Sequence, residues 1–173
     1  VKAFICTQDL KEEAYINSHY VIMCTKKGQV KKTSLEQYSR PRSNGINAIT
    51  IKDNDELLEA KLTTGNSQVL IAVKSGKCIR FEEGKTRPMG RNASGVRGIK
   101  LKDNSDEVIG MISVNDMDSD ILVVSENGYG KRSSLEDYRI TNRGGKGVKT
   151  ISITDKTGSL VSVKNVSDGD DLM

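Results

Sequence analysis

The sequence has no tryptophan and little proline, histidine, cysteine or aromatic character. Its 173 residues include 2 Pro, 1 His, 3 Cys, 5 Tyr and 2 Phe. No apolar run approaches the roughly 18 residues of a membrane-spanning helix, and no charged-then-apolar signal peptide opens the chain. With one histidine, no Ser-His-Asp or Cys-His set for nucleophilic catalysis can be assembled, and no Gly-x4-Gly-Lys-(Ser/Thr) phosphate loop occurs. We therefore expect a cytoplasmic, membrane-free chain that is not itself catalytic.

The few potential metal ligands have no metal-site spacing. Cys6, Cys24 and Cys78 show no Cys-x-x-Cys pattern and lie in apolar, strand-like runs, which favours reduced structural thiols. The acidic segments 53–56 and 103–107 lack the regular spacing of oxygen ligands in a calcium loop. The sequence therefore predicts no metal and no cofactor bound by this chain.

Glycine, by contrast, is abundant and recurs in register. Among the 16 glycines, Gly28, Gly76 and Gly128 open three related segments and are 48 and 52 residues apart. Related glycines close the same segments at Gly45, Gly95 and Gly147. A period near 50 suits a four-stranded propeller-type blade better than a two-helix repeat. We predict an all-β, propeller-like array of four-stranded antiparallel blades, with about three and a fraction repeats.

Each repeat has the same expected order of strands. An apolar run, a turn glycine and a second strand predict hairpins at 19–25 with 29–33, 68–73 with 77–81, and 120–125 with 129–133. An alternating strand is expected next at 46–51, 96–101 and 148–153, and a lead-out strand at 57–62, 108–114 and 159–163. Segment 1–7 has the lead-out pattern. The expected repeats are 1–51, 52–101 and 102–153, with 154–173 beginning a further blade of a longer protein.

Positive charge is concentrated in one part of each repeat. The windows 26–42, 74–102 and 131–149 hold 21 of the 27 Lys and Arg residues but only 5 of the 23 Asp and Glu residues. The net charge of +4 hides this segregation. A basic stripe renewed in every repeat predicts a polyanionic partner.

The positions of the basic residues make physical sense as phosphate contacts. The position four residues after each turn glycine is basic, as Lys32, Arg80 and Arg132, and Lys31 and Lys131 precede two of them. The other candidate phosphate contacts are Arg40, Arg42, Arg87, Arg91, Arg97, Arg143, Lys146 and Lys149. Asn and Gln, which read base edges, are sparse in these segments, so we expect weak sequence preference.

The repeated motifs also admit simpler interpretations. A single basic pair on a strand is usually a solvated face, but its threefold recurrence favours function. Ser34-Leu-Glu-Gln-Tyr38 and Ser134-Leu-Glu-Asp-Tyr138 contain a hydroxyl in each repeat, yet they are more typical of a short turn capped by Thr33 or Ser133. Their tyrosines are expected to pack between blades.

Together these motifs resemble one protein family. The hairpin glycine, basic pair, Ser-Leu-Glu-x-Tyr, basic loop and Gly-x-x-x-Ile are similar to the C-terminal DNA-wrapping domain of the DNA gyrase A subunit, over the whole chain. Segments 127–132, 89–99 and 143–147 carry the resemblance most clearly. It implies a β-pinwheel whose neighbouring blades exchange a strand and whose basic rim bends DNA.

The resemblance also implies a role within a larger enzyme. The parent would be an ATP-dependent type II topoisomerase that introduces negative supercoils, with ATP, Mg²⁺ and the cleavage tyrosine on other domains or subunits. Its partners would be DNA, the gyrase B subunit and a second A subunit, in the bacterial nucleoid. The family's glycine-rich signature box has only a degenerate copy here, made of Arg143, Gly144, Gly145, Lys146 and Gly147.

Two alternatives remain at this stage. Because the first two positions of the box differ, the parent can also be the topoisomerase IV A subunit, whose corresponding domain selects DNA geometry. A propeller used as a protein-interaction platform is a more remote alternative, because the chain lacks Trp-Asp signatures and an aromatic-rich surface.

Overall fold

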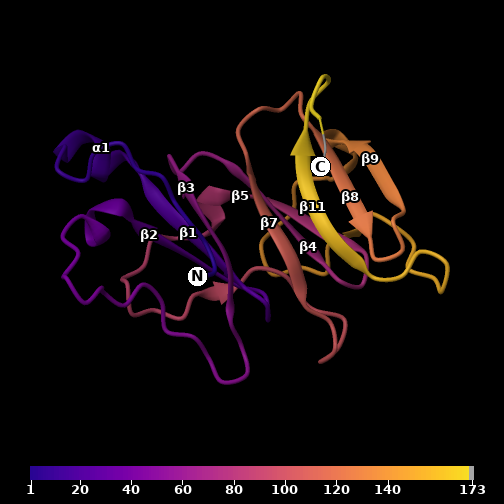
Figure 1. Cartoon of the computed structure of the whole chain (residues 1–173), viewed down its shortest axis with the longest axis horizontal. Coiled ribbons are helices and arrows are strands. Elements are labelled where there is room, and N and C mark those ends of the chain that lie inside the picture. Colours follow the sequence, from indigo (N-terminus) through magenta and orange to yellow (C-terminus); the bar gives the residue numbers. More distant parts are fainter. Residues whose placement is uncertain (172–173) are drawn as a thin grey trace.

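The computed structural model describes residues 1–171, which form three antiparallel sheets in a row (Figure 1). The elements in chain order are α1 (Glu13–Ser18), β1 (Tyr20–Thr25), β2 (Gln29–Ser34), η1 (Leu35–Tyr38), β3 (Leu57–Thr63), β4 (Gln68–Val73), β5 (Lys77–Glu82), η2 (Glu83–Lys85), β6 (Val96–Arg97), β7 (Val108–Val114), β8 (Asp120–Ser125), β9 (Gly130–Ser134), η3 (Leu135–Asp137), β10 (Val148–Lys149) and β11 (Leu160–Val166). The strand orders are β3-β1-β2-β6 in sheet A, β10-β5-β4-β7 in sheet B and β11-β8-β9 in sheet C. The predicted all-β class, with antiparallel four-stranded sheets, is confirmed.

The three predicted hairpins are present and turn at the expected glycines. Gly28, Gly76 and Gly128 have φ of 81°, 80° and 80°, a left-handed conformation that glycine adopts without a Cβ penalty. Each of these amides donates to the carbonyl three residues earlier, at 2.9–3.0 Å. The hairpins therefore share one turn geometry.

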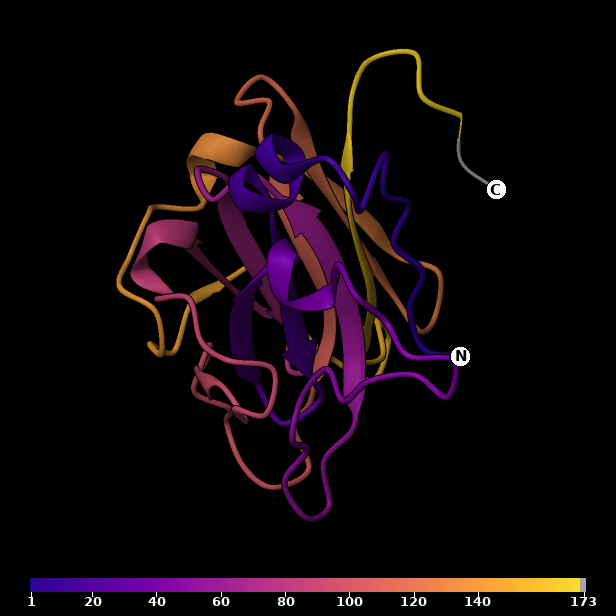
Figure 2. The same cartoon turned by 90° about the vertical axis from the view of Figure 1, so that its left-hand side faces the viewer.

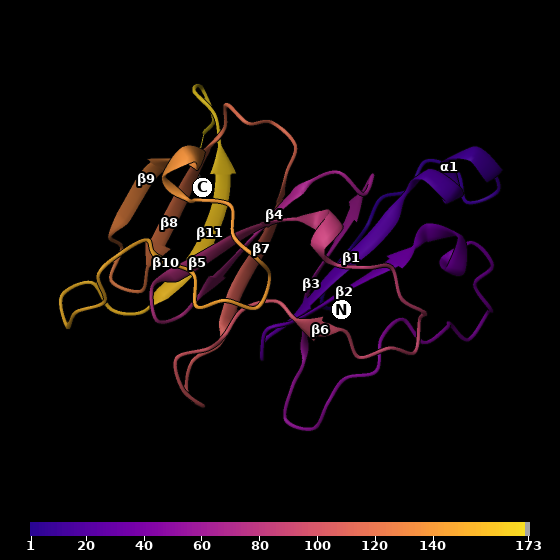
Figure 3. The same ribbon diagram turned by 180° about the vertical axis from the view of Figure 1, so that it is seen from behind.

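Sheets A and B are each completed by a strand from the following repeat. Strand β6 pairs with β2, with Val96 opposite Val30, and β10 pairs with β5, with Val148 opposite Cys78. Figure 3 shows both short strands at the ends of long loops. Sheet C has three strands within residues 1–171. Neighbouring blades are thus joined by backbone pairing as well as by side-chain packing.

Several expected strands are shorter or absent. Segments 1–7 and 46–51 are not strands, and only the first two residues of 96–101 and 148–153 pair. The segment after a closing glycine pairs with the hairpin of the preceding repeat, as β6 does with β2. A lead-out strand pairs with the nearest hairpin before it in the chain, as β3 does with β1 and β7 with β4. Within residues 1–171 no hairpin precedes β1, so neither 1–7 nor 46–51 has a partner there. Alternating hydrophobicity was therefore a poor guide to these segments.

Two apolar cores hold the row together, and both use sheet B. The first joins Ile22, Cys24 and Val30 of sheet A to side chains such as Ile71 and Ile79 of sheet B. The second joins the other face of sheet B, through residues including Leu70 and Cys78, to sheet C. Figure 2, taken along the row, shows the strands of successive sheets lying behind one another. Sheet B is therefore buried on both faces.

The outer face of sheet A is covered by a helix that the sequence did not indicate. Segment 8–18 was expected to be a polar connection, but α1 forms within it and buries Ile16 against a cluster containing Val21, Met23 and Leu35. A helix of six residues is too short for a helical hydrophobic period to show in the sequence.

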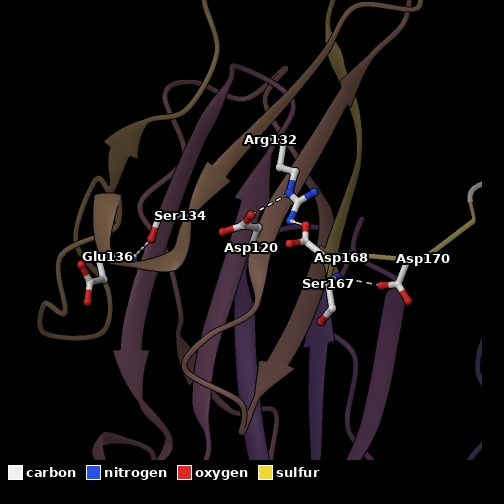
Figure 4. A network of polar contacts seen from close by, with 7 residues as sticks. All are labelled: Asp120, Arg132, Ser134, Glu136, Ser167, Asp168 and Asp170. Atoms are coloured by element: carbon white, nitrogen blue, oxygen red, sulfur yellow. Dashed lines mark hydrogen bonds and ion pairs between the residues drawn. The ribbon is translucent and has the colours of Figure 1, made fainter.

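The predicted capped turns form as short 3₁₀ helices, but Ser34 makes no side-chain cap in the first, and the cap of the third is a different residue from the one expected. Ser134 Oγ accepts a hydrogen bond from the Glu136 amide at 3.2 Å (Figure 4). Ser133 Oγ and Thr33 Oγ1, the expected caps, are buried without a hydrogen-bond partner in the described part of the chain. Tyr138 is buried in the core between sheets B and C, as expected for a tyrosine packed between blades. Tyr38 is instead half-buried against the cluster on the outer face of sheet A.

Candidate nucleic-acid interface

The three basic loops lie side by side along one edge of the molecule. They follow the 3₁₀ helices at residues 39–50, 86–100 and 138–150, and together we call them the loop rim. The Thr50 amide and hydroxyl donate to the carbonyls of Ala93 and Asn92, at 3.3 and 2.7 Å. One repeat later, the Lys100 amide donates to the Gly145 carbonyl at 2.8 Å. Since the same contact recurs, the loop rim is continuous from the first repeat to the third.

Arginines surround a hollow at the first end of the loop rim. Arg40, Arg42 and Arg91 line it, together with Gln37, Ile46 and one acidic residue, Glu36. Arg91 is held in place, because its Nη1 donates to the Asn47 carbonyl at 3.1 Å and its amide donates to Gln37 Oε1 at 3.1 Å. Arg40 and Arg42 are exposed, so this end presents cations on a partly fixed frame.

Lysines gather in the middle of the loop rim. The β5–β10 register places Lys77 opposite Lys149, and like charges directly opposite each other on a sheet are unfavourable. Lys77, Lys100, Lys102 and Lys146 also line a common hollow. An anion bound among these ammonium groups would relieve their mutual repulsion, as phosphate does when a protein binds DNA.

Arg143 joins two loops and does not project freely. Its Nε donates to the Lys85 carbonyl at 3.3 Å, and its Nη1 donates to the Arg97 carbonyl. The Gly144 amide next to it donates to the Gly98 carbonyl at 2.8 Å. In the degenerate box, this guanidinium and this amide are thus engaged with protein carbonyls, while Lys146 is exposed.

The glycine that closes the box is required by strand packing. Gly147 has φ of +71°, and a Cβ there would lie 2.4 Å from the Cys78 carbonyl oxygen. The absence of a side chain therefore allows β10 to approach β5. The same is true of Gly95, where a Cβ would lie 2.6 Å from the Val30 carbonyl oxygen.

Some residues that the sequence suggested as phosphate contacts lie in the interior. Lys31, Lys32 and Arg80 are 0%, 5% and 8% exposed. The Lys31 ammonium donates to the carbonyls of Ala48 and Arg91. Lys32 and Arg80 likewise donate to carbonyls of the protein, those of Glu83 and Leu135. These three side chains are not part of the loop-rim surface.

The remaining candidate residues differ in how exposed and how free of protein partners their side chains are. Lys131 is exposed and donates to the Thr150 carbonyl at 3.4 Å, while Arg132 is exposed but forms ion pairs with Asp120 and Asp168, both at 2.6 Å. The exposed loop-rim candidates are Arg40, Arg42, Arg87, Arg97, Lys146 and Lys149, and the half-buried ones are Arg91 and Arg143. Sequence reasoning overlooked Lys77 and Lys100. The pairing register places Lys77 opposite Lys149.

Acidic residues are not wholly excluded from this region. Asp106 is buried beside the lysine hollow, where its carboxylate accepts from the Ser75 amide at 3.0 Å, the Ser75 hydroxyl at 2.8 Å and the Lys102 amide at 3.0 Å. It closes the hairpin turn of sheet B. Within residues 1–171, no group of three or more His, Cys, Asp or Glu side chains is placed to hold a metal ion. In the same part of the chain, no helix is both long and apolar enough to cross a membrane.

The fold and the loop rim define a class: a bladed β-array whose neighbours exchange strands and whose linked loops form a cationic edge. A family model described as the DNA gyrase C-terminal domain, a beta-propeller, matches residues 19–64, 68–115 and 119–167. The chain belongs to this family.

Relatives and solved structures agree with that assignment. The chain is 42% identical over its full length to the DNA gyrase A subunit of Staphylococcus epidermidis, and equally to that of Staphylococcus aureus, and it spans 19% of each. A solved structure of the DNA gyrase A C-terminal domain aligns with 88% of this chain, and the alignment covers 50% of the solved chain, with a TM-score of 0.75 and 28% identity. The C-terminal domain of DNA topoisomerase IV matches 87% of this chain and 47% of its own, with a TM-score of 0.82 and 24% identity, which supports the fold alone. The expected β-pinwheel is confirmed.

Proposed function

We propose that this chain binds and bends double-stranded DNA as the accessory C-terminal domain of a gyrase A subunit. The observation that carries the proposal is the continuous loop rim, in which Lys149 faces Lys77 of the adjoining strand β5 and Arg40 and Arg42 extend the positive charge. DNA carries one negative charge per about 1.7 Å of helix axis, so a row of cations can contact successive phosphates. The contacts are to phosphate, which predicts weak sequence preference.

Within the whole enzyme, the bent duplex would supply the second DNA segment for strand passage. The loop rim would hold DNA along a fixed path and so favour one sign of crossing. ATP hydrolysis, Mg²⁺ and DNA cleavage would be provided by other domains and by the gyrase B subunit, with a second A subunit completing the enzyme in the bacterial cytoplasm. The role of this chain is thus non-catalytic within an ATP-dependent type II topoisomerase that introduces negative supercoils.

Binding of a random-sequence duplex at several salt concentrations tests the proposal. We expect the logarithm of the association constant to fall steeply with the logarithm of salt, by about 0.9 for each phosphate contact. Changing Lys77, Lys146 and Lys149 to Ala should reduce that slope by about 2 to 3. A matched control removes three lysines outside the loop rim, Lys11, Lys61 and Lys164, and should leave the slope nearly unchanged. Equal slopes in the two triple variants would refute the loop rim as the DNA site.

Topoisomerase IV is a second candidate parent, favoured by the altered first two positions of the box. The gyrase and topoisomerase IV alternatives can be separated by relaxing a closed circular plasmid with a nicking-closing enzyme while this chain is bound to it. A gyrase-type domain that wraps DNA should leave a change in linking number of one sign. DNA that is bound without such a change would favour the topoisomerase IV alternative.

A further inference from the structure

One basic position in each hairpin reaches into the next repeat. Lys32 and Arg80 each lie four residues after a turn glycine, on β2 and β5. Lys32 Nζ donates to the Glu83 carbonyl at 3.3 Å, and Arg80 Nη1 donates to the Leu135 carbonyl at 2.7 Å. Glu83 and Leu135 are equivalent, because each is the first residue of a 3₁₀ helix. We call this hydrogen bond, from a strand cation to the first carbonyl of the next 3₁₀ helix, a clasp. It occurs at two successive blade junctions.

The backbone of the same two residues holds the beginning of the next basic loop. The Met89 amide donates to the Lys32 carbonyl at 2.8 Å, and the Thr141 amide donates to the Arg80 carbonyl at 2.9 Å. Parallel bridges connect Lys32 with Pro88 and Arg80 with Ile140. Side chain and carbonyl together hold the segment from the 3₁₀ helix to the base of the loop. Arg87 lies within the first of these segments and Arg139 within the second.

Both cations have further polar partners in the interior. Arg80 also donates from Nη1 to the Tyr138 carbonyl at 3.0 Å and from Nε to Gln68 Oε1 at 2.6 Å. Lys32 has a second partner in the Glu83 carboxylate, 3.8 Å away and 0% exposed. In the other two repeats the position of Glu83 is a leucine. A buried cation is costly without partners, and here the partners all come from the same blade or the next one.

We propose that Lys32 and Arg80 are positioning residues that set the path of bound DNA from inside the protein. Each fixes the next basic loop at one orientation to its own blade and makes no phosphate contact. This inference rests on the proposed function.

The third member of the series shows the same arrangement on the surface. Arg132 Nε donates to Asp120, which occupies the position of Gln68, and its Nη2 donates to Asp168 (Figure 4). Asp120 begins β8 as Gln68 begins β4. In the second and third hairpins, the first residue thus accepts a hydrogen bond from the cation, whether or not a following 3₁₀ helix covers that cation.

The test separates the path of the DNA from its phosphate contacts. We would compare Arg80→Met, which keeps the aliphatic volume, with Arg80→Lys, which keeps a donor as in the Lys32 clasp. The control is Lys149→Ala on the loop rim. Energy transfer between dyes at the two ends of a duplex measures the bend of the bound DNA. Binding titrations at several salt concentrations give the slope of the logarithm of the association constant against the logarithm of salt.

We expect Arg80→Met to reduce the bend and leave the salt slope unchanged, whereas Lys149→Ala lowers the slope by about 0.9. Arg80→Lys should restore the bend. A fall in slope for Arg80→Met equal to that of Lys149→Ala would overturn the inference, and so would an unchanged bend. Absence of salt-sensitive binding by the unmodified chain would instead refute the proposed function.

A second measurement applies even if Arg80→Met does not fold. In the unmodified protein, acylation of lysines with and without DNA should leave Lys32 slowly labelled in both states. Lys146 and Lys149 should be labelled rapidly and become protected by DNA. Rapid labelling of Lys32 that DNA prevents would show a phosphate contact and overturn the inference.

Discussion

At the scale of single residues, Lys31 is the most unusual cation in the protein. Its side chain is fully buried, and its ammonium donates to two carbonyls, those of Ala48 and Arg91. Burial, together with the nearby positive charge of Arg91, lowers the pKa of Lys31 to about 8. The protein thus holds a lysine that loses its proton close to physiological pH.

This shift predicts how stability depends on pH. An unfolded lysine keeps its proton up to a pKa of about 10.4, so between pH 8 and pH 10 the unfolded chain binds more protons than the folded one. The contribution of Lys31 to the free energy of unfolding should therefore rise over this range and be constant below it. Urea unfolding at pH 7 to 10 measures the effect.

The comparison that isolates Lys31 uses two variants. Lys31→Met should show a smaller rise than the unmodified protein, while Lys164→Met, which alters an exposed lysine, should behave like the unmodified protein. Identical pH profiles for all three proteins would contradict the assigned shift.

The sequence shows that basic residues recur at fixed positions, but it could not separate those inside the protein from those on the surface. A cation repeated at one position, as at Lys32 and Arg80, is equally compatible with a phosphate contact and with an interior bond to a neighbouring repeat. The choice depends on whether a following 3₁₀ helix covers the side chain. Lys77 was overlooked for the related reason that its opposition to Lys149 exists only after the strands pair.

At the scale of secondary-structure elements, the closing glycines allow one repeat to complete the sheet of another. A Cβ at Gly147 would meet the Cys78 carbonyl oxygen at 2.4 Å. Gly147→Ala should therefore destabilise the protein by about 2 to 4 kcal/mol, through a steric clash and backbone strain. Thermal or urea unfolding measures the loss.

A turn glycine provides the matched control for this prediction. Gly128 has a similar positive φ, +80°, but a Cβ there would meet no atom within 4 Å. Gly128→Ala should cost only the backbone strain, about 1 kcal/mol. Equal losses for the two alanines would show that the approach of β10 to β5 is not the reason for Gly147.

The sequence correctly predicted the strands that contain their own apolar run, namely the three hairpins and the three lead-out strands β3, β7 and β11. The hairpins follow from apolar runs interrupted by Gly28, Gly76 and Gly128. The two-residue strands β6 and β10 have no such local signal, because pairing with a distant hairpin creates them. Local patterns therefore overestimated 96–101 and 148–153 and assigned strands at 1–7 and 46–51, which have no partner in the described chain.

At the scale of the whole molecule, sheet B is the structural centre. It contributes to both apolar cores, and β4 lies between β5 and β7 with five of its six residues buried. Strand β9 is at the edge of sheet C, and four of its five residues are exposed. The row of blades should therefore be less stable at the β9 edge of sheet C than at its centre.

Hydrogen exchange measured by mass spectrometry tests this gradient. Amides of β4 should exchange slowest, since they open only when both cores are lost, and amides of β9 should exchange fastest among the hairpin strands. Strand β1, also central in its own sheet, serves as the intermediate reference. Equal protection of β4 and β9 would mean that the blades unfold as a single unit.

The completion of each sheet by the next repeat also has a consequence for synthesis on the ribosome. Strand β2 ends at Ser34, but its partner β6 begins at Val96. At roughly 5 to 20 residues per second, the ribosome needs about 3 to 12 s to make the intervening residues. During that interval the emerging hairpin has an open edge, so each repeat matures only after the following one has been translated. A pause in translation within residues 35–95 would prolong the time during which nascent chains can associate through those edges.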